Sequence, residues 1–76
     1  GYNSMEKEFV KIDTPFIRLD ALLKFAGATD TGGQAKVLVQ SGHVAVNGAT
    51  CTQRGKKLVP GDEVVCAGRT FVVAQA

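Results

Sequence analysis

The chain has 76 residues, 45% of them hydrophobic, and carries a formal net charge of +2. This length suits one small domain with a modest core and little room for an enclosed active-site cavity. No apolar run approaches the roughly 20 residues of a membrane-spanning helix, and no secretory signal pattern opens the sequence. We therefore expect a cytoplasmic protein without a membrane segment. Residues 1–4, before Met5, are expected to be a remnant of an expression tag, which leaves 5–76 as one domain.

The first part of the sequence predicts one strand and one helix. Residues 8–13 alternate weakly between polar and apolar side chains and indicate a short strand. Residues 18–27 favour a helix, because four apolar side chains recur at i, i+3, i+4 and i+7: Leu19, Leu22, Leu23 and Ala26. Gly27 suits the position after the helix end. Asp20 and Lys24 are expected to form an i,i+4 ion pair on its outer side.

A second helix is predicted over residues 31–42. Thr31, with Gln34 three residues later, fits a capping box at its start, and Gly42 ends it. Its apolar stripe consists of Ala35, Leu38 and Val39. The link between the two helices is very short, so they are expected to pack as a corner or hairpin.

After Gly42 the hydrophobic pattern changes to a period of two, which is typical of strands. Asn47–Gly48 is a strong signal for a tight hairpin turn. Strands are predicted at 43–48, 49–52, 63–67 and 69–76, with a polar, basic loop at 53–57. The predicted fold class is therefore α+β, with two helices packed on a small, mostly antiparallel sheet.

The charged residues are unevenly distributed. Between Ala35 and Gly61 every charged residue is basic: Lys36, Arg54, Lys56 and Lys57. A basic segment inside a nearly neutral chain can form a local patch that attracts an anionic partner.

The two cysteines and the aromatic residues have plain structural interpretations. Cys51 and Cys66 lack the paired spacing of a zinc site, and we expect two reduced thiols, with a disulfide between neighbouring strands as the alternative. The aromatic residues are expected in the core or the tag rather than in a base-stacking platform: Tyr2, Phe9, Phe16, Phe25 and Phe71. Phe25 is the exception, because it falls off the main apolar stripe of the first helix.

The order of these motifs resembles the RNA-binding domain of small-subunit ribosomal protein S4, over roughly residues 16–66. The segments that carry the resemblance are Arg18-Leu19-Asp20, Ala35-Lys36 with Leu38-Val39, Gly42 to Gly48 (GHVAVNG), and Gly61-Asp62. The TGGQAK segment and the small size are similar to the stand-alone bacterial branch of the family, the YbcJ and YaaA type. This resemblance implies a two-helix alpha-L motif that binds RNA without catalysis. Ribosomal RNA, transfer RNA or a ribosomal particle would be the partner, with the protein a monomer.

One departure from the family pattern concerns the start of the second helix. Ribosomal and pseudouridine synthase members usually have Ser-Arg there, whereas this chain has Thr31 and Gly32. A helix start presents unpaired N–H groups that bind phosphate, and Gly32 and Gly33 remove the side chains that would keep a phosphate away. Lys36 follows one turn later. The alternative is that the glycines only permit a tight turn or close packing between the helices.

Further RNA-binding candidates lie outside that helix start. Arg18 is expected at the N-cap of the first helix, against its local preference, which suggests an RNA contact; the alternative is a solvated arginine. Arg54, Lys56 and Lys57 form a basic loop that either contacts phosphates or is simply solvated. His43 precedes a strand and can touch RNA or stack on a base.

No nucleophile, nucleotide-binding or metal-binding pattern is present, so no catalytic residue, cofactor or metal is expected. The sequence therefore predicts an RNA-binding module that contacts structured RNA mainly through phosphates. The alternative is a protein-interaction or assembly module that uses a sheet edge and the apolar C-terminal strand.

Overall fold

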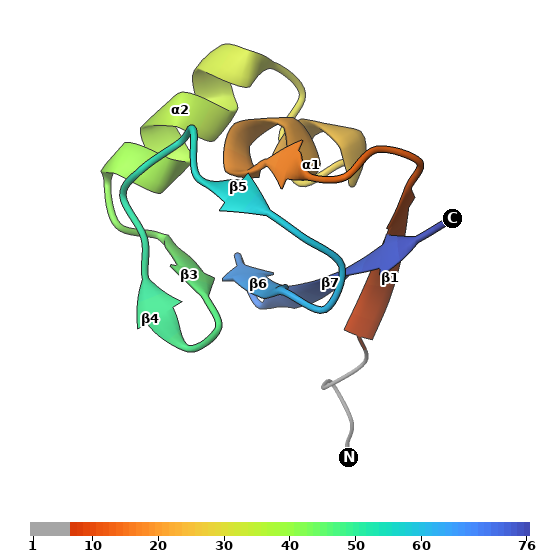
Figure 1. Cartoon of the computed structure of the whole chain (residues 1–76). Helices are drawn as coiled ribbons and strands as arrows, with labels where there is room; N and C mark the ends of the chain where they lie inside the picture. Colours follow the sequence, from red (N-terminus) through yellow and green to blue (C-terminus); the bar gives the residue numbers. More distant parts are fainter. Residues whose placement is uncertain (1–6) are drawn as a thin grey trace.

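The structure, a computed structural model, describes residues 7–76. The expected tag remnant at 1–4, and with it Tyr2, lies outside the described residues, as does Met5. The elements are β1 (Lys7–Ile12), β2 (Ile17–Arg18), α1 (Leu19–Phe25), α2 (Gly32–Gln40), β3 (Val44–Val46), β4 (Ala49–Thr50), β5 (Lys57–Leu58), β6 (Glu63–Cys66) and β7 (Arg69–Gln75). Figure 1 shows both helices on one side of the sheet, which confirms the predicted α+β class.

The main sheet has five strands in the order β1-β7-β6-β3-β4. Its pairs are antiparallel except for β1 with β7, which run parallel. The C-terminal strand β7 therefore lies between two neighbours. A partner strand therefore has no free edge at β7, because its hydrogen-bonding groups are used by β1 and β6. The edges of this sheet are β1 and β4.

Helix α1 begins and ends close to the predicted positions. Arg18 is its N-cap, and Gly27 follows the C-cap in the left-handed region with φ of 79°. The predicted ion pair of Asp20 with Lys24 is not present among the described residues. The carboxylate of Asp20 instead accepts a hydrogen bond from Nη2 of Arg18 at 3.3 Å, because Arg18 folds back over the first turn.

Helix α2 has a capping arrangement slightly different from the predicted box. The Thr31 hydroxyl accepts the Gln34 N–H at 3.1 Å, as expected. The Gln34 side chain, however, accepts from the N–H of Asp30 at 2.9 Å rather than from that of Thr31. The Gln34 side chain thus binds the residue before the N-cap rather than the N-cap itself. The two side chains still satisfy two backbone N–H donors around the helix start, those of Asp30 and Gln34.

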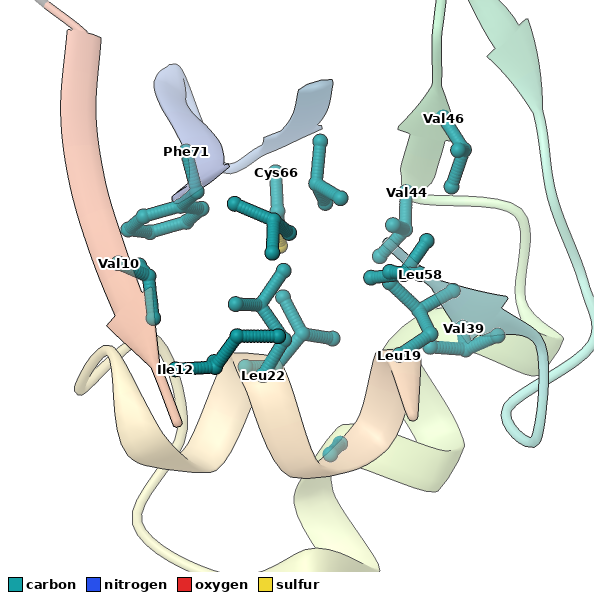
Figure 2. Close-up of a cluster of buried hydrophobic side chains, with 14 residues drawn as sticks. Val10, Ile12, Leu19, Leu22, Val39, Val44, Val46, Leu58, Cys66 and Phe71 are labelled. Carbon is teal, nitrogen blue, oxygen red and sulfur yellow. The ribbon is translucent and has the colours of Figure 1, made fainter. Parts of the chain in front are cut away.

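The core lies between the helices and the inner face of the sheet (Figure 2). Leu19, Leu22 and Leu23 of the predicted stripe are fully buried, and Phe71 is the largest buried side chain. The predicted burial of Phe9 and Phe16 is wrong, since these rings are 66% and 40% exposed. Val10 and Ile12 point inward from β1, so the alternation of a strand directs Phe9 outward. Phe25, expected to differ, is 68% exposed.

The hairpin between β3 and β4 has the predicted tight turn, with positive φ at Asn47 (51°) and Gly48 (85°). The Asn47 side chain also accepts the N–H of Glu63 at 3.0 Å and donates to Asp62 at 3.2 Å. Asp62 in turn accepts the N–H of Val59 at 2.9 Å. Two motif positions of the resemblance, Asn47 and Asp62, thus join two turns of the fold.

The two thiols are free, Cys66 being buried and Cys51 half-buried. Strand β3 separates them, because Val44 pairs with Cys66 on one side and accepts the Cys51 N–H at 2.9 Å on the other. Two strand spacings amount to about 10 Å, beyond the ~7 Å that a disulfide spans between Cα atoms. The alternative of a disulfide therefore does not fit this sheet.

Candidate nucleic-acid interface

The basic loop at 53–57 lies against the start of α1. The N–H of Leu19 donates to the carbonyl of Lys56 at 2.9 Å, and the N–H of Asp20 donates to that of Arg54 at 3.0 Å. A helix start leaves its first N–H groups without intrahelical acceptors, and the side chain of Arg18 makes no cap. The loop backbone supplies the missing acceptors, so the loop has a fixed position on the helix.

This docking gathers four basic side chains, which we call the basic cluster: Arg18, Arg54, Lys56 and Lys57. Arg18 and Lys57 are register partners in the short β2–β5 ladder. That ladder was not predicted, since the sequence indicated only a loop at Lys57; the fully buried Leu58 holds it in place. Gly55 lies beside the Arg18 guanidinium, where a Cβ would be 3.6 Å from Nη2.

The cluster keeps most of its charge free. Arg18 pairs with Asp20, but no ion pair involves Arg54, Lys56 or Lys57 within residues 7–76. The ammonium of Lys57 lies 4.9 Å from the centre of the Phe16 ring, a cation–π contact that leaves its charge available. All four side chains belong to residues that are exposed. The arrangement presents a cationic surface at the start of α1.

Helix α2 adjoins this surface through the core. Leu19, Val39 and Leu58 lie together in Figure 2, so α1, α2 and β5 meet below the cluster. Lys36 precedes Val39 by one turn and is exposed. The start of α2, with Thr31, Gly32 and Gly33, lies roughly 5–8 Å from Lys36 along the helix axis, at 1.5 Å per residue. No hydrogen bond or ion pair joins these three residues to the cluster in the described part of the chain.

The two glycines at the start of α2 are not required by packing. Neither has a positive φ, and a Cβ added at Gly32 would meet no atom within 4 Å. At Gly33 its nearest neighbour would be the Thr31 hydroxyl oxygen at 3.8 Å. The alternative that the glycines permit a tight turn or close packing is therefore not supported.

His43 lies beyond the opposite end of α2. Its Nδ1 is 2.7 Å from the Ser41 hydroxyl oxygen, and its N–H donates to the Leu38 carbonyl at 3.1 Å. These bonds close the last turn of α2, and none links His43 to the basic cluster among the described residues. Of the predicted candidates, the structure thus gathers four in the basic cluster, while Lys36, His43 and the α2 start have no bond to it among the described residues.

A groove beside the basic loop was not predicted. It has a volume of about 290 Å³ and runs along β4 and the chain that follows it. Its lining residues are Val46, Ala49, Thr50, Cys51, Thr52, Gln53 and Lys56. No sequence motif marks this groove, whose wall includes Gln53 and Lys56 of the basic loop; the acid-free run at 35–61 was the single available signal.

A scan against family models and two searches of known proteins agree on the relatives of this chain. Residues 10–74 match the model described as "S4 domain". The Escherichia coli protein named "Putative RNA-binding protein YbcJ" is 39% identical over 59 residues, covering 78% of this chain and 84% of that protein. The Bacillus subtilis "Probable ribosome maturation protein RlbA" is also 39% identical over 59 residues, with 78% and 83% covered.

A solved structure extends this likeness to the fold. The solution structure of E. coli YbcJ, described as having an alpha-L motif involved in RNA binding, superposes with a TM-score of 0.65. The two sequences are 34% identical, and the alignment covers 92% of this chain and 87% of that one. The family match spans most of the sequence, and the chain belongs to the S4 domain family.

Proposed function

We propose that this protein is a non-enzymatic RNA-binding module whose basic cluster contacts the phosphate backbone. The observation that carries the proposal is the docking of the 53–57 loop on α1, which holds four cations together on one surface. Phosphate contacts from lysine and arginine supply most sequence-independent RNA affinity. The exposed phenyl rings of Phe9 and Phe25 lie outside this cluster.

The start of α2 would serve as a second phosphate contact. The side chain of Thr31 occupies the N–H of Gln34, while the N–H groups of Gly32 and Gly33 have no acceptor among the described residues. Such donors and the partial positive charge of a helix start favour an anion. Lys36 follows this helix start by one turn and is exposed, so an RNA backbone running along α2 could meet both. His43 would touch RNA only at the far end of such a path.

The names of the relatives favour ribosomal RNA as the partner. One is called an RNA-binding protein and another a ribosome maturation protein. A ribosomal particle or its RNA is thus the first candidate, and transfer RNA the second. The protein would act as a monomer in the cytoplasm.

Crosslinking in living cells followed by sequencing of the attached RNA tests this proposal. Enrichment of ribosomal RNA over its abundance is the expected result, with transfer RNA as the second possibility. A gel-shift series from low to high salt then separates the binding modes. Phosphate-dominated binding weakens steeply with salt, whereas binding to an apolar protein partner does not.

The protein-interaction alternative is favoured by a different surface. A groove of about 380 Å³ lies at the edge strand β1, between Phe9 and Phe25. A partner strand could add to this edge and cover both rings. A protein partner that is retained at high salt and lost in Phe9→Ser would support that function instead.

A further inference from the structure

The groove along β4 has the lining that a nucleobase needs. Val46 and Ala49 provide apolar surface, while the hydroxyls of Thr50 and Thr52 and the amide of Gln53 provide polar groups. A hydroxyl or amide can both donate and accept hydrogen bonds. A base likewise has two apolar faces and a polar edge, and single-stranded RNA is recognised through both. The volume of about 290 Å³ lies at the small end of ligand pockets, which start near ~300 Å³.

The electrostatic surroundings favour an anionic polymer rather than a neutral or cationic ligand. Lys56, one of the basic cluster, also lines this groove, and no acidic residue does. The groove at the opposite edge of the sheet differs, since its lining includes both the acidic Glu8 and the basic Lys11. A nucleotide at β4 could therefore place its base in the groove while its phosphate meets Lys56.

The walls of the groove are held in place by hydrogen bonds. The carbonyl of Gln53 accepts the N–H of Lys56 at 3.1 Å and the thiol of Cys51 at 3.7 Å. The N–H of Cys51 donates to Val44 in the neighbouring strand. At Gln53 these bonds involve only the backbone carbonyl, which leaves its side-chain amide free to meet a ligand. A site formed in advance loses little entropy when it binds.

We propose that the β4 groove takes one unpaired nucleobase of the RNA, next to the phosphate bound by Lys56. The inference rests on the proposed RNA-binding function and adds base contact to phosphate contact. The recognised element is an unpaired nucleotide, such as one in a loop or bulge. The mixed donors and acceptors predict a preference for unpaired bases over paired ones.

Zero-length ultraviolet crosslinking tests this proposal, because such links form between a base and a side chain in direct contact. The probe is total bacterial ribosomal RNA, and nuclease digestion before mass spectrometry leaves one nucleotide on the attached residue. We expect a nucleotide adduct within 49–56, chiefly at the Cys51 thiol, and its loss in Cys51→Ser. Cys66 is buried and should carry none, which makes it an internal control.

A matched pair of substitutions gives a second readout. Gln53→Ala removes the free amide. It should lower RNA affinity about two- to tenfold, which corresponds to the loss of one hydrogen bond. The salt dependence of binding should stay unchanged. Gln40→Ala, at the exposed end of α2, should leave both unchanged. The loop should stay folded, because its bonds involve the backbone carbonyl at this position.

The outcomes separate the two proposals. Salt-sensitive RNA binding without an adduct in 49–56, and with Gln53→Ala equal to wild type, would remove the base groove and keep the phosphate-binding function. Adducts confined to Phe9 or Phe25 would move base contact to the opposite edge and overturn the inference. Failure to bind either this RNA or total bacterial transfer RNA used in its place would overturn both.

Discussion

The two edges of the sheet differ in what their grooves offer. The groove at β1 is the larger, about 380 Å³ against 290 Å³, and Phe9 and Phe25 line it together with the oppositely charged Glu8 and Lys11. The groove at β4 is lined by hydroxyls, an amide and Lys56. Size would select the first as the binding site, whereas charge and polarity select the second for RNA. For an anionic partner the chemistry of the lining decides.

The cations at the two edges also have different uses. At β1, Arg69 donates two hydrogen bonds to Glu8, at 2.7 and 2.8 Å, and a third to the Ala26 carbonyl at 3.4 Å. Lys7 likewise pairs with Glu63 at 2.8 Å. At the other edge, the 53–57 loop is attached to α1 by hydrogen bonds to its backbone carbonyls. Its cationic side chains therefore remain free of ion pairs within residues 7–76. The first arrangement holds strands together, and the second leaves charge for a partner.

The largest expected effect comes from removing the loop cations. Changing Arg54, Lys56 and Lys57 together to Ala should weaken RNA binding at least tenfold. The slope of log affinity against log salt should flatten by about 2, since each single-strand phosphate contact contributes ~0.7. Stability should change little, by up to ~1 kcal/mol, because the capping carbonyls remain and only the cation–π contact of Lys57 is lost.

A control triple at the opposite edge makes this comparison sharper. The control changes three other lysines to Ala together, Lys7, Lys11 and Lys24, and so removes the same net charge. Thermal unfolding checks that both triple variants remain folded. The control should bind RNA with nearly the wild-type salt slope. Equal losses in both triples would mean that overall charge, rather than the basic cluster, drives binding.

A smaller effect is expected at the start of α2. Gly32→Ala meets open space at an ordinary φ, so it should stabilise the fold by up to about 1 kcal/mol in thermal or denaturant unfolding. If a phosphate approaches the bare backbone, the same change weakens RNA binding several-fold. Gly32→Arg then gives no gain despite its added charge. Tighter binding by Gly32→Arg would show instead that this position only lacks the arginine usual in the family.

The smallest effect is a pH dependence at the β1 edge. The hydrogen bond from Arg69 lowers the pKa of Glu8 below its ordinary value of 4.5. A lowered folded-state pKa contributes stability above pH 4.5, which is lost as the pH falls through the folded-state value. The melting temperature of Glu8→Gln should therefore vary less than that of wild type below pH 4.5, with RNA affinity at neutral pH unchanged. Lower RNA affinity in Glu8→Gln would place the β1 edge in the interface.

The state of the thiols gives a further check on the β4 edge. Intact mass under non-reducing conditions should match two reduced cysteines, because β3 separates Cys51 from Cys66. A mass lower by two hydrogens would mean that the strands around the groove pair differently.

The sequence predicted the elements that depend on a local pattern of residues. The apolar stripe of α1, the cap of Thr31 and the Asn47–Gly48 turn are local features, and each appears as expected. The β2–β5 ladder has only two residues on each side, too few for a pattern. The exposure of Phe9 follows from which face of β1 meets the helices, and that depends on the parallel pairing with β7.

The candidate interface shows the same division between local and long-range information. The acid-free run predicted a basic patch, and Arg18 stood out because it opposed its local preference. The capping of α1 by the carbonyls of Arg54 and Lys56 could not be predicted, because it joins segments more than thirty residues apart through backbone atoms. The β4 groove joins β3 and β4 with Gln53 and Lys56 of the loop, and no single segment carried a signal for it.

Hydrogen–deuterium exchange of the protein with and without total bacterial ribosomal RNA tests the central claim most directly. Bound RNA should slow exchange in peptides that cover the start of α1 and the 53–57 loop, while β1 and the end of α1 around Phe25 remain unchanged. Protection confined to β1 and Phe25, with none in the loop, would contradict the assignment of RNA binding to the basic cluster.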